Sequence, residues 1–235
     1  MSISEDGLRK NQANFASLSP LSFLERTRKT FPNQTAIEYK DYKLSYKQAG
    51  QRCDALANLI KNQNFNSGST IAVMLPNIPV MWECHFGVPM ATGVLNAINT
   101  RLDSHTVQFI LEHGEAKLFI YDSEYSPIVE KALVNLKNPP TIIEFVDEVA
   151  GNKRSNFANK VNCLDYESEL KNFIGTTFEH VLPNDEWNSI ALNYTSGTTG
   201  NPKGVVYHHR GAYLNAIGNS LTWDLPMHPK YLWTL

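Results

Sequence analysis

A stretch rich in glycine and hydroxyl residues, residues 194–204 (YTSGTTGNPKG), constrains this chain more than any other feature. Apolar residues lead into it from Ile190, and Val205 and Val206 follow it, which predicts a strand, a loop and a second strand. Glycine lets a backbone turn tightly and direct successive N–H groups into one concavity, and hydroxyl groups add donors for phosphate oxygens. Lys203 adds a positive charge. The pattern predicts a loop that binds the phosphates of a nucleotide.

This stretch differs from the P-loop of the common nucleoside triphosphatases. That motif has Gly, four residues and then Gly-Lys-Ser/Thr at the start of a helix. Here Pro202 stands in place of the second glycine, Gly204 stands in place of the magnesium-binding hydroxyl, and valines follow. The alternative interpretation is an ordinary turn between two strands, although such turns rarely run this long or end in Pro-Lys-Gly.

The remainder of the chain predicts an α/β fold. Apolar runs that are typical of strands alternate with segments of helical periodicity, and this alternation favours mixed or parallel sheets with flanking helices. The expected strands are 70–75, 95–98, 117–121 and 141–146, and the expected helices are 79–93, 104–114, 127–136, 166–173 and 212–221. Segments 36–39 and 43–45 predict a hairpin, and the polar segment 149–162 predicts a surface loop.

Helix starts are indicated by capping residues. Ser22 with Glu25 and Ser45 with Gln48 both have the spacing of a capping box, and Ser104 is expected to cap the helix that follows it. Cys53 falls in the apolar stripe of the helix after Ser45, so we expect it in the core.

Composition excludes several classes of function. A net charge of −2 gives no strong field for nucleic acid or an anionic membrane. The three cysteines, Cys53, Cys84 and Cys163, are far apart and odd in number, which argues against a disulfide framework and favours a reducing cytoplasm. The most apolar stretch, 86–98, is shorter than the about 20 residues that a membrane span needs. Residues 1–18 are polar and predict a loosely ordered leader.

The run Thr-Ser-Gly-Thr-Thr-Gly-x-Pro-Lys-Gly closely resembles the signature loop of the adenylate-forming (AMP-binding) enzymes, which include acyl-CoA synthetases, luciferases and peptide-synthetase adenylation domains. His209 and Arg210 fit the downstream pattern of the family. Segments 21–25, 75–77 and 96–102 look most like acyl-CoA synthetases for short- or medium-chain acids. The resemblance extends from about residue 18 onward, so residues 19–235 are similar to part of the N-terminal domain of that fold.

The resemblance implies a two-step reaction. A carboxylic acid reacts with ATP to give an acyl-adenylate and pyrophosphate, and coenzyme A then displaces AMP. It also implies that loop residues bind the β- and γ-phosphates, that Lys203 lies on the pyrophosphate, and that Mg²⁺ bridges phosphate oxygens through a protein ligand that the sequence leaves unknown. The cofactor-binding residues expected are Thr195, Ser196, Gly197, Thr198, Thr199, Gly200 and Lys203. The resemblance allows a homodimer of the full-length enzyme.

The family pattern continues well beyond residue 235. The adenine-binding segment, the magnesium-binding Thr-Glu pair, the ribose-binding aspartate and the adenylation lysine lie outside these residues, so the sequence is expected to be the N-terminal fragment of a longer ligase and to be inactive alone. Two alternatives remain: a non-catalytic phosphate-binding module, and an adenylation enzyme that loads a carrier protein instead of coenzyme A.

Other candidate residues are interpreted as structural. Glu83, Cys84 and His85 are adjacent on a predicted helix and point in different directions, which disfavours a shared metal ion. His208 and His209 are expected to cap or pack the helix after the second strand. Arg101 could bind an anion or serve as a hydrogen-bonded structural arginine.

Overall fold

The computed structural model describes residues 4, 7–195 and 201–234. Its main feature is a seven-stranded sheet in the order β7-β6-β5-β3-β4-β8-β9. All neighbouring strands in it are parallel except β8 and β9, which form an antiparallel hairpin. The strands are β3 (Thr70–Met74), β4 (Val94–Ala97), β5 (Leu118–Asp122), β6 (Thr141–Phe145), β7 (Cys163–Asp165), β8 (Ser189–Thr195) and β9 (Lys203–His208).

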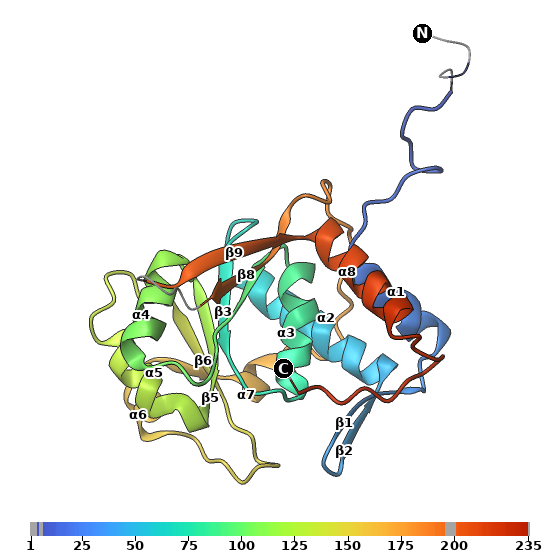
Figure 1. The fold of residues 1–235 in the computed structure, drawn as a ribbon. Helices are drawn as coiled ribbons and strands as arrows, with labels where there is room; N and C mark the ends of the chain where they lie inside the picture. The colour runs from blue at the N-terminus through green and yellow to red at the C-terminus, as the bar shows by residue number, and fades with distance from the viewer. Residues whose placement is uncertain (1–3, 5–6, 196–200, 235) are drawn as a thin grey trace.

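Helices cover both faces of this sheet (Figure 1). The first face packs against α2 (Tyr46–Asn62), α3 (Pro79–Met90) and α7 (Tyr166–Lys171), with α1 (Leu21–Thr30) outside them. The second face packs against α4 (Ser104–His113), α5 (Ser126–Leu133) and α6 (Asn156–Lys160). The expected α/β fold, a mixed sheet with flanking helices, is therefore confirmed.

Alternation along the central strand explains why the sheet has two apolar faces. In β3, Ile71 and Val73 point into the core under α2 and α3, whereas Ala72 and Met74 point into the core under α4. Successive side chains of a strand face opposite sides, so a strand covered on both faces is apolar at every position. The four named side chains are fully buried.

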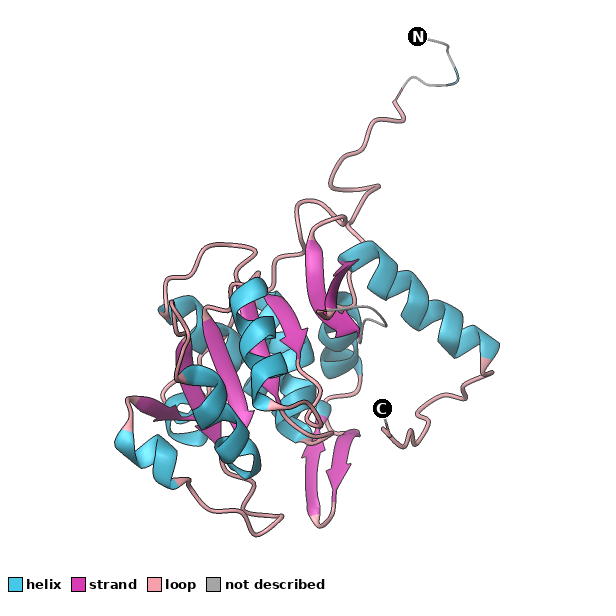
Figure 2. Cartoon of the chain, turned by 60° about the vertical axis from the view of Figure 1, so that its left-hand side comes forward, coloured by secondary structure: helices cyan, strands magenta, loops and turns pink. Residues whose placement is uncertain are grey.

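Two further elements lie outside the main sheet. The hairpin of β1 (Thr35–Tyr39) and β2 (Tyr42–Ser45) is antiparallel, as predicted, and projects from the body of the molecule in Figure 2. The long helix α8 (His209–Thr222) follows β9 and lies beside α1 in Figure 1. Phe23 of α1 stacks on Tyr213 of α8 with ring centroids 4.6 Å apart.

The capping predictions have mixed outcomes. The Ser45–Gln48 box at the start of α2 is confirmed, with both reciprocal hydrogen bonds present. The Ser22 box is wrong, because α1 begins at Leu21 after Pro20 and the Ser22 hydroxyl donates to the Ser19 carbonyl oxygen instead. The Ser104 cap is also wrong. Asp103 caps α4, and its carboxylate accepts hydrogen bonds from two first-turn amides.

The polar segment 149–162 is not entirely a loop. It contains the short helix α6, which begins where the Ser155 hydroxyl accepts a hydrogen bond from Ala158 N at 3.0 Å. Ala158 is buried in the core of the second face and Phe157 packs against it, so tertiary contacts order a segment that has little periodicity of its own.

The ends of the chain run over the surface. Residues 7–17 extend away from the body in Figure 1, and residues 226–234 return past α3. Asn77 Nδ2 donates to the Trp233 carbonyl oxygen at 3.3 Å, which joins that returning segment to the end of β3. In the described part of the chain, no helix is long and apolar enough to cross a membrane.

Candidate functional site

The predicted strand–loop–strand is the β8–β9 hairpin. Its register pairs Thr195 with Lys203, Tyr194 with Gly204 and Asn193 with Val205. Of the predicted phosphate-binding residues, Thr195 and Lys203 therefore lie directly opposite each other at the last pair before the loop. The other five, Ser196, Gly197, Thr198, Thr199 and Gly200, lie outside the described residues.

The position of the hairpin in the sheet determines where its loop begins. Strand β8 is parallel to β4, with Ala191 opposite Leu95, so Thr195 lies at the edge where the parallel strands have their carboxyl ends. Open α/β sheets bind ligands outside this edge. The hairpin therefore presents its loop at the edge of the sheet that is used for binding in other α/β folds.

The mouth of the loop has polar groups exposed to solvent. Thr195 and Lys203 are both exposed. Among the described residues, no carboxylate pairs with the Lys203 ammonium, so its charge is available to an anion that approaches the loop. A hydroxyl and an ammonium group on opposite strands can bind a phosphate between them.

Tyr194, the residue before Thr195, is held by a helix on the second face of the sheet. Its Oη lies 2.7 Å from Nδ1 of His113, the last residue of α4. Its ring meets that of Phe109 edge-on, with centroids 6.4 Å apart. Gly204 lies opposite Tyr194, and a Cβ at Gly204 would be 2.9 Å from Leu192 Cδ1 and 3.5 Å from the Tyr194 ring, so it would contact both side chains.

The far end of the hairpin is tied to the N-terminal segment. The Glu186 carboxylate accepts hydrogen bonds from Leu18 N at 2.9 Å and from Arg210 Nη1 at 2.7 Å. The Ser19 hydroxyl lies 2.8 Å from His209 Nδ1, and both side chains are buried. Burial lowers the pKa of His209. These contacts hold the junction of β9 and α8, and sequence reasoning missed Glu186 and Ser19 because neither stands in a recognisable motif.

The two histidines at the junction of β9 and α8 have structural roles, as predicted. His208 caps α8, because its Nδ1 accepts a hydrogen bond from Gly211 N at 2.8 Å. His209 is the buried first residue of the helix. Arg101, the other cation considered, lies in an exposed turn in which its backbone N–H donates to Asn99 Oδ1.

Glu83, Cys84 and His85 point apart, as expected from their adjacent helical positions. Glu83 is fully buried, and its carboxylate accepts hydrogen bonds from Arg52 and from Tyr166 Oη, the latter at 2.8 Å. Burial raises the pKa of Glu83, and the Arg52 guanidinium opposes that rise. Cys84 is in the core, and the His85 ring lies 5.7 Å from that of Trp233. Glu83 joins α3 to α2 and α7.

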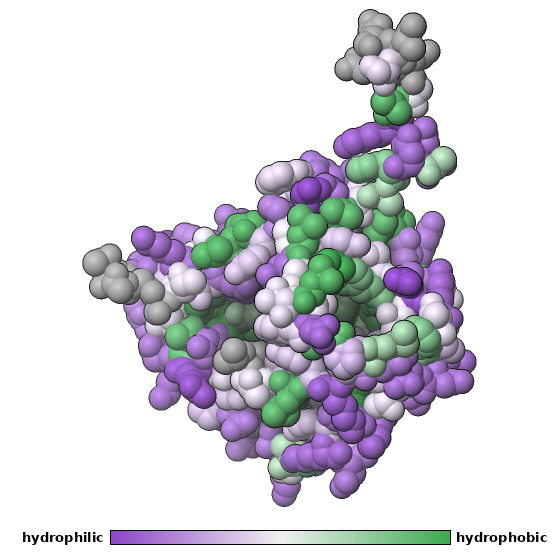
Figure 3. All heavy atoms as spheres, turned by 45° about the vertical axis from the view of Figure 1, so that its right-hand side comes forward, coloured by the Kyte–Doolittle hydropathy of each residue, from purple (hydrophilic) through white to green (hydrophobic). Residues whose placement is uncertain are grey.

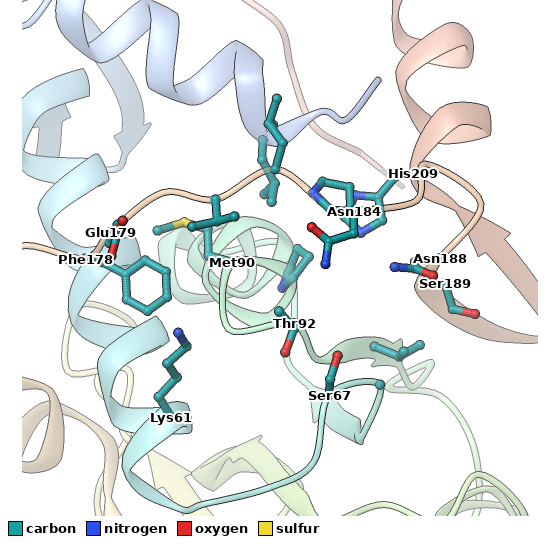
Figure 4. Close-up of a pocket in the computed structure, with 17 residues that line it drawn as sticks. Lys61, Ser67, Met90, Thr92, Phe178, Glu179, Asn184, Asn188, Ser189 and His209 are labelled. Atoms are coloured by element: carbon teal, nitrogen blue, oxygen red, sulfur yellow. The ribbon is translucent and has the colours of Figure 1, made fainter. Parts of the chain in front are cut away.

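A cavity of about 410 Å³ lies at the opposite edge of the sheet. Its lining includes residues at the amino ends of β4 and β8, Val94 and Ser189. Figure 4 shows Lys61 and Phe178 on one side of it and Asn188 and His209 on the other. Because the amino ends of parallel strands lie a full strand length from their carboxyl ends, this cavity is separate from the loop.

Hydrophobic side chains are also exposed beyond the hairpin. Figure 3 shows them interspersed with hydrophilic residues on the side of the molecule that carries α8. Among the described residues, the large exposed apolar side chains of α8 and the segment after it are Leu214, Ile217, Leu221, Trp223, Leu225, Met227, Tyr231 and Leu232.

Comparison with known proteins places these features in context. The family model described as "AMP-binding enzyme" matches residues 24–235. An acetate–CoA ligase from Humulus lupulus is 39% identical over 98% of this chain and 42% of its own length. A peroxisomal acetate/butyrate–CoA ligase from Arabidopsis thaliana is 38% identical over 98% of this chain and 42% of its own. The chain thus spans about two fifths of the length of these curated relatives.

Solved structures share the fold. An anthranilate CoA ligase in complex with anthranoyl-AMP has a TM-score of 0.74 at 22% identity, over 86% of this chain and 37% of its own. The N-terminal subdomain of NpsA from Klebsiella oxytoca has a TM-score of 0.60 at 17% identity, over 85% of this chain and 44% of its own. At these identities the likeness concerns the fold alone.

Proposed function

Since this chain belongs to the AMP-binding enzyme family, we propose that it forms the phosphate-binding part of an enzyme that activates a carboxylic acid with ATP and transfers the acyl group to coenzyme A. The observation that carries the proposal is the β8–β9 hairpin, which sets the exposed Thr195 and Lys203 opposite each other at the carboxyl edge of the sheet. The names of the relatives support it, because they are CoA ligases.

The proposed chemistry has two steps. A carboxylate oxygen of the acid attacks the α-phosphorus of ATP, the bond from that phosphorus to its bridging oxygen breaks, and pyrophosphate leaves with the electron pair. The thiolate sulfur of coenzyme A then attacks the acyl carbonyl carbon, and AMP leaves. In the first step, negative charge builds on the departing phosphates, so donors and cations placed around them lower the barrier.

The loop residues divide this task among themselves. Lys203 places its ammonium on the pyrophosphate, and backbone amides and hydroxyls of the loop bind the β- and γ-phosphates. Tight turns at the glycines allow successive amides to face one anion. The residues assigned to this role are Thr195, Ser196, Gly197, Thr198, Thr199 and Gly200.

Magnesium is expected to accompany ATP, but its ligands are not assigned to this part of the chain. Mg²⁺ is usually held by one or two carboxylates together with phosphate oxygens. The described residues at the mouth of the loop offer a hydroxyl and an ammonium group, and the described part of the chain contains no group of three metal-binding side chains. No step is therefore derived through the metal.

The proposed substrate is a short- or medium-chain acid, since the names of three relatives specify acetate, butyrate and 2-methylpropanoate. We also propose a cytoplasmic location, a leader of residues 1–18 before the partial adenylation domain 19–235, and a homodimer of the full-length enzyme. Several relatives are called peroxisomal, so cell fractionation decides the location. Limited proteolysis and light scattering test the other two proposals.

Replacing Lys203 tests the proposed function directly. Lys203→Ala removes a charged hydrogen bond to phosphate. In a full-length ligase, the dissociation constant of MgATP should therefore rise, and the rate of acid-dependent pyrophosphate release should fall, each about ten- to a hundredfold. Titration calorimetry and a pyrophosphate assay measure these two quantities. Lys137→Ala, an exposed lysine outside the hairpin, is the matched control and should change neither. Identical values for Lys203→Ala and wild type would remove Lys203 from the mechanism.

A further inference from the structure

Tyr194, one residue before the last strand pair of the hairpin, is anchored to a helix far away in the sequence. Tyr194 and His113 are separated by 81 positions, yet Tyr194 Oη lies 2.7 Å from His113 Nδ1. Burial raises the pKa of Tyr194, so its hydroxyl keeps its proton and can donate it to Nδ1 when His113 carries its own proton on Nε2. Tyr194 is half-buried and His113 is exposed, so neither is a core residue.

The Tyr194 hydroxyl can approach the end of α4 because the residue there, Gly114, has no side chain. A Cβ at Gly114 would lie 2.9 Å from the Ile110 carbonyl oxygen, 3.2 Å from Asn96 Nδ2 and 3.3 Å from Tyr194 Oη. A backbone oxygen at that distance cannot move aside easily, so Gly114 lets the Tyr194 hydroxyl reach the end of α4. Sequence position alone does not reveal this requirement.

A buried carboxamide adjoins the same point. Asn96 on β4 is fully buried, and within the described residues its Oδ1 and Nδ2 have no hydrogen-bond partner. An unpaired buried polar group is unfavourable, because it has lost its hydrogen bonds to water. Asn96 Nδ2 and Tyr194 Oη both lie near the position that a Gly114 Cβ would occupy, so the carboxamide borders the place where Tyr194 reaches α4.

We propose that Tyr194 and His113 are positioning residues for the phosphate loop. Gly114 leaves room for their contact, and Asn96 borders it. Successive side chains of a strand point to opposite faces of the sheet. Fixing Tyr194 against α4 on one face therefore directs the Thr195 side chain to the other face, where Thr195 pairs with Lys203 on the neighbouring strand. The inference rests on the proposed function, because it assigns the pair the task of holding the two loop ends ready for a triphosphate.

The pair acts through the loop and does not contact the reacting atoms. Loss of one neutral hydrogen bond in a half-buried place is worth about 0.5–1.5 kcal/mol, which corresponds to about a two- to tenfold change in an equilibrium constant. The effect should appear in the dissociation constant of MgATP. It should be absent from the KM of the acid, because the proposed function assigns only the phosphates of ATP to this loop.

Amide hydrogen exchange tests the anchoring without a nucleotide. In Tyr194→Phe, which keeps the ring, the amides of the Tyr194–Gly204 and Thr195–Lys203 pairs should exchange about two- to tenfold faster than in the wild type. Amides at the far end of the hairpin, at Ala191 and Tyr207, should not change. His113→Ala should have the same effect as Tyr194→Phe, and His113→Asn, which places a polar atom near the position of Nδ1, should restore protection.

Nucleotide binding tests the positioning role. Tyr194→Phe and His113→Ala should each weaken MgATP binding about two- to tenfold. The double variant should be no worse than either single variant, because both remove the same bond. His105→Ala, an exposed histidine on the first turn of the same helix, is the matched control and should leave binding unchanged. Loss of one such hydrogen bond should lower the unfolding temperature by no more than about 6 °C in a protein of this size, so the variants should remain folded.

The outcomes separate this inference from the proposed function. Unchanged exchange at Thr195 and Gly204 in Tyr194→Phe overturns the inference, whatever happens to ATP. Faster exchange with unaltered MgATP affinity also overturns it, provided that Lys203→Ala weakens binding. If Lys203→Ala binds as the wild type does, the role of Lys203 in the proposed function is contradicted, while the exchange experiment still decides whether His113 anchors Tyr194.

Discussion

Side chains of the same type have different roles in this molecule, depending on how deeply they are buried and which groups they contact. His209 and His208 are adjacent, yet the first is buried against Ser19, whereas the second is half-buried and accepts a hydrogen bond from Gly211 N at the start of α8. Glu83 and Glu25 are both paired with arginines, but Glu83 is fully buried whereas Glu25 is partly exposed. A buried pair costs far more to break than an exposed one, because the remaining charge has no water around it.

At this scale we predict an acid sensitivity from His209. Its folded-state pKa lies below the unfolded value of about 6.5, so its contribution to stability is present above that pH and is lost as the pH falls through the folded pKa. Between pH 6.5 and 5, the free energy of unfolding of the wild type should fall more steeply than that of His209→Asn, which does not titrate. Urea unfolding at a series of pH values measures both, and parallel curves would contradict the prediction.

Helices α2 and α4 each begin where a side chain accepts hydrogen bonds from free amide groups of the first turn. In α2 the expected Ser45–Gln48 box does this, and in α4 Asp103 does it one residue before the serine that sequence favoured. Asp and Ser are both good capping residues, and they are adjacent here at positions 103 and 104. The sequence therefore does not decide which of the two precedes the first residue of the helix. The backbone of Asp103 is extended, with φ −77° and ψ 165°, as a capping residue requires.

Substitutions at the two positions should therefore differ. Asp103→Ala removes the acceptor for the His105 and Thr106 amides and should lower the free energy of unfolding by about 0.5–2 kcal/mol. Ser104→Ala should change it by less than about 0.5 kcal/mol. Chemical denaturation of both variants gives the comparison. A larger loss for Ser104→Ala than for Asp103→Ala would show that α4 begins one residue later.

The molecule as a whole depends on how closely its helices pack. Helices α2 and α3 lie together on the first face of the sheet, and Gly87 of α3 meets Leu56 of α2. A Cβ at Gly87 would lie 2.9 Å from both Cβ and Cγ of Leu56, which are near the backbone and cannot swing away. In contrast, a Cβ at Gly218 of α8 would have no neighbouring atom within 4 Å.

The same change at these two glycines should have opposite effects. Gly87→Ala overpacks the contact between α2 and α3 and should destabilise the protein by about 1–3 kcal/mol. Gly218→Ala fills open space and removes a poor helix former, so it should stabilise the protein by about 0.5–1 kcal/mol. Thermal unfolding of both variants supplies the test, and a stable Gly87→Ala would mean that the two helices are farther apart than the structure places them.

The sequence alone determined the features that depend on neighbouring residues. The two strands around the 194–204 stretch, the alternation of strands and helices, and the Ser45 cap all follow from local periodicity or from spacings of a few residues. The family resemblance followed from the same stretch. The roles of the seven predicted loop residues stay a prediction, and five of the seven lie outside the described residues.

Only the tertiary structure decided which distant groups meet. Strand β8 inserts beside β4, more than 90 positions earlier in the chain, and this places Tyr194 under the end of α4 and against His113. The junction of β9 and α8 is likewise held by Leu18 and Ser19. The spacing of apolar residues in the sequence indicates which face of a helix or strand is buried. The order of strands in the sheet depends on how all the helices and strands pack together. The loop was therefore visible in the sequence, and the residues that hold it were not.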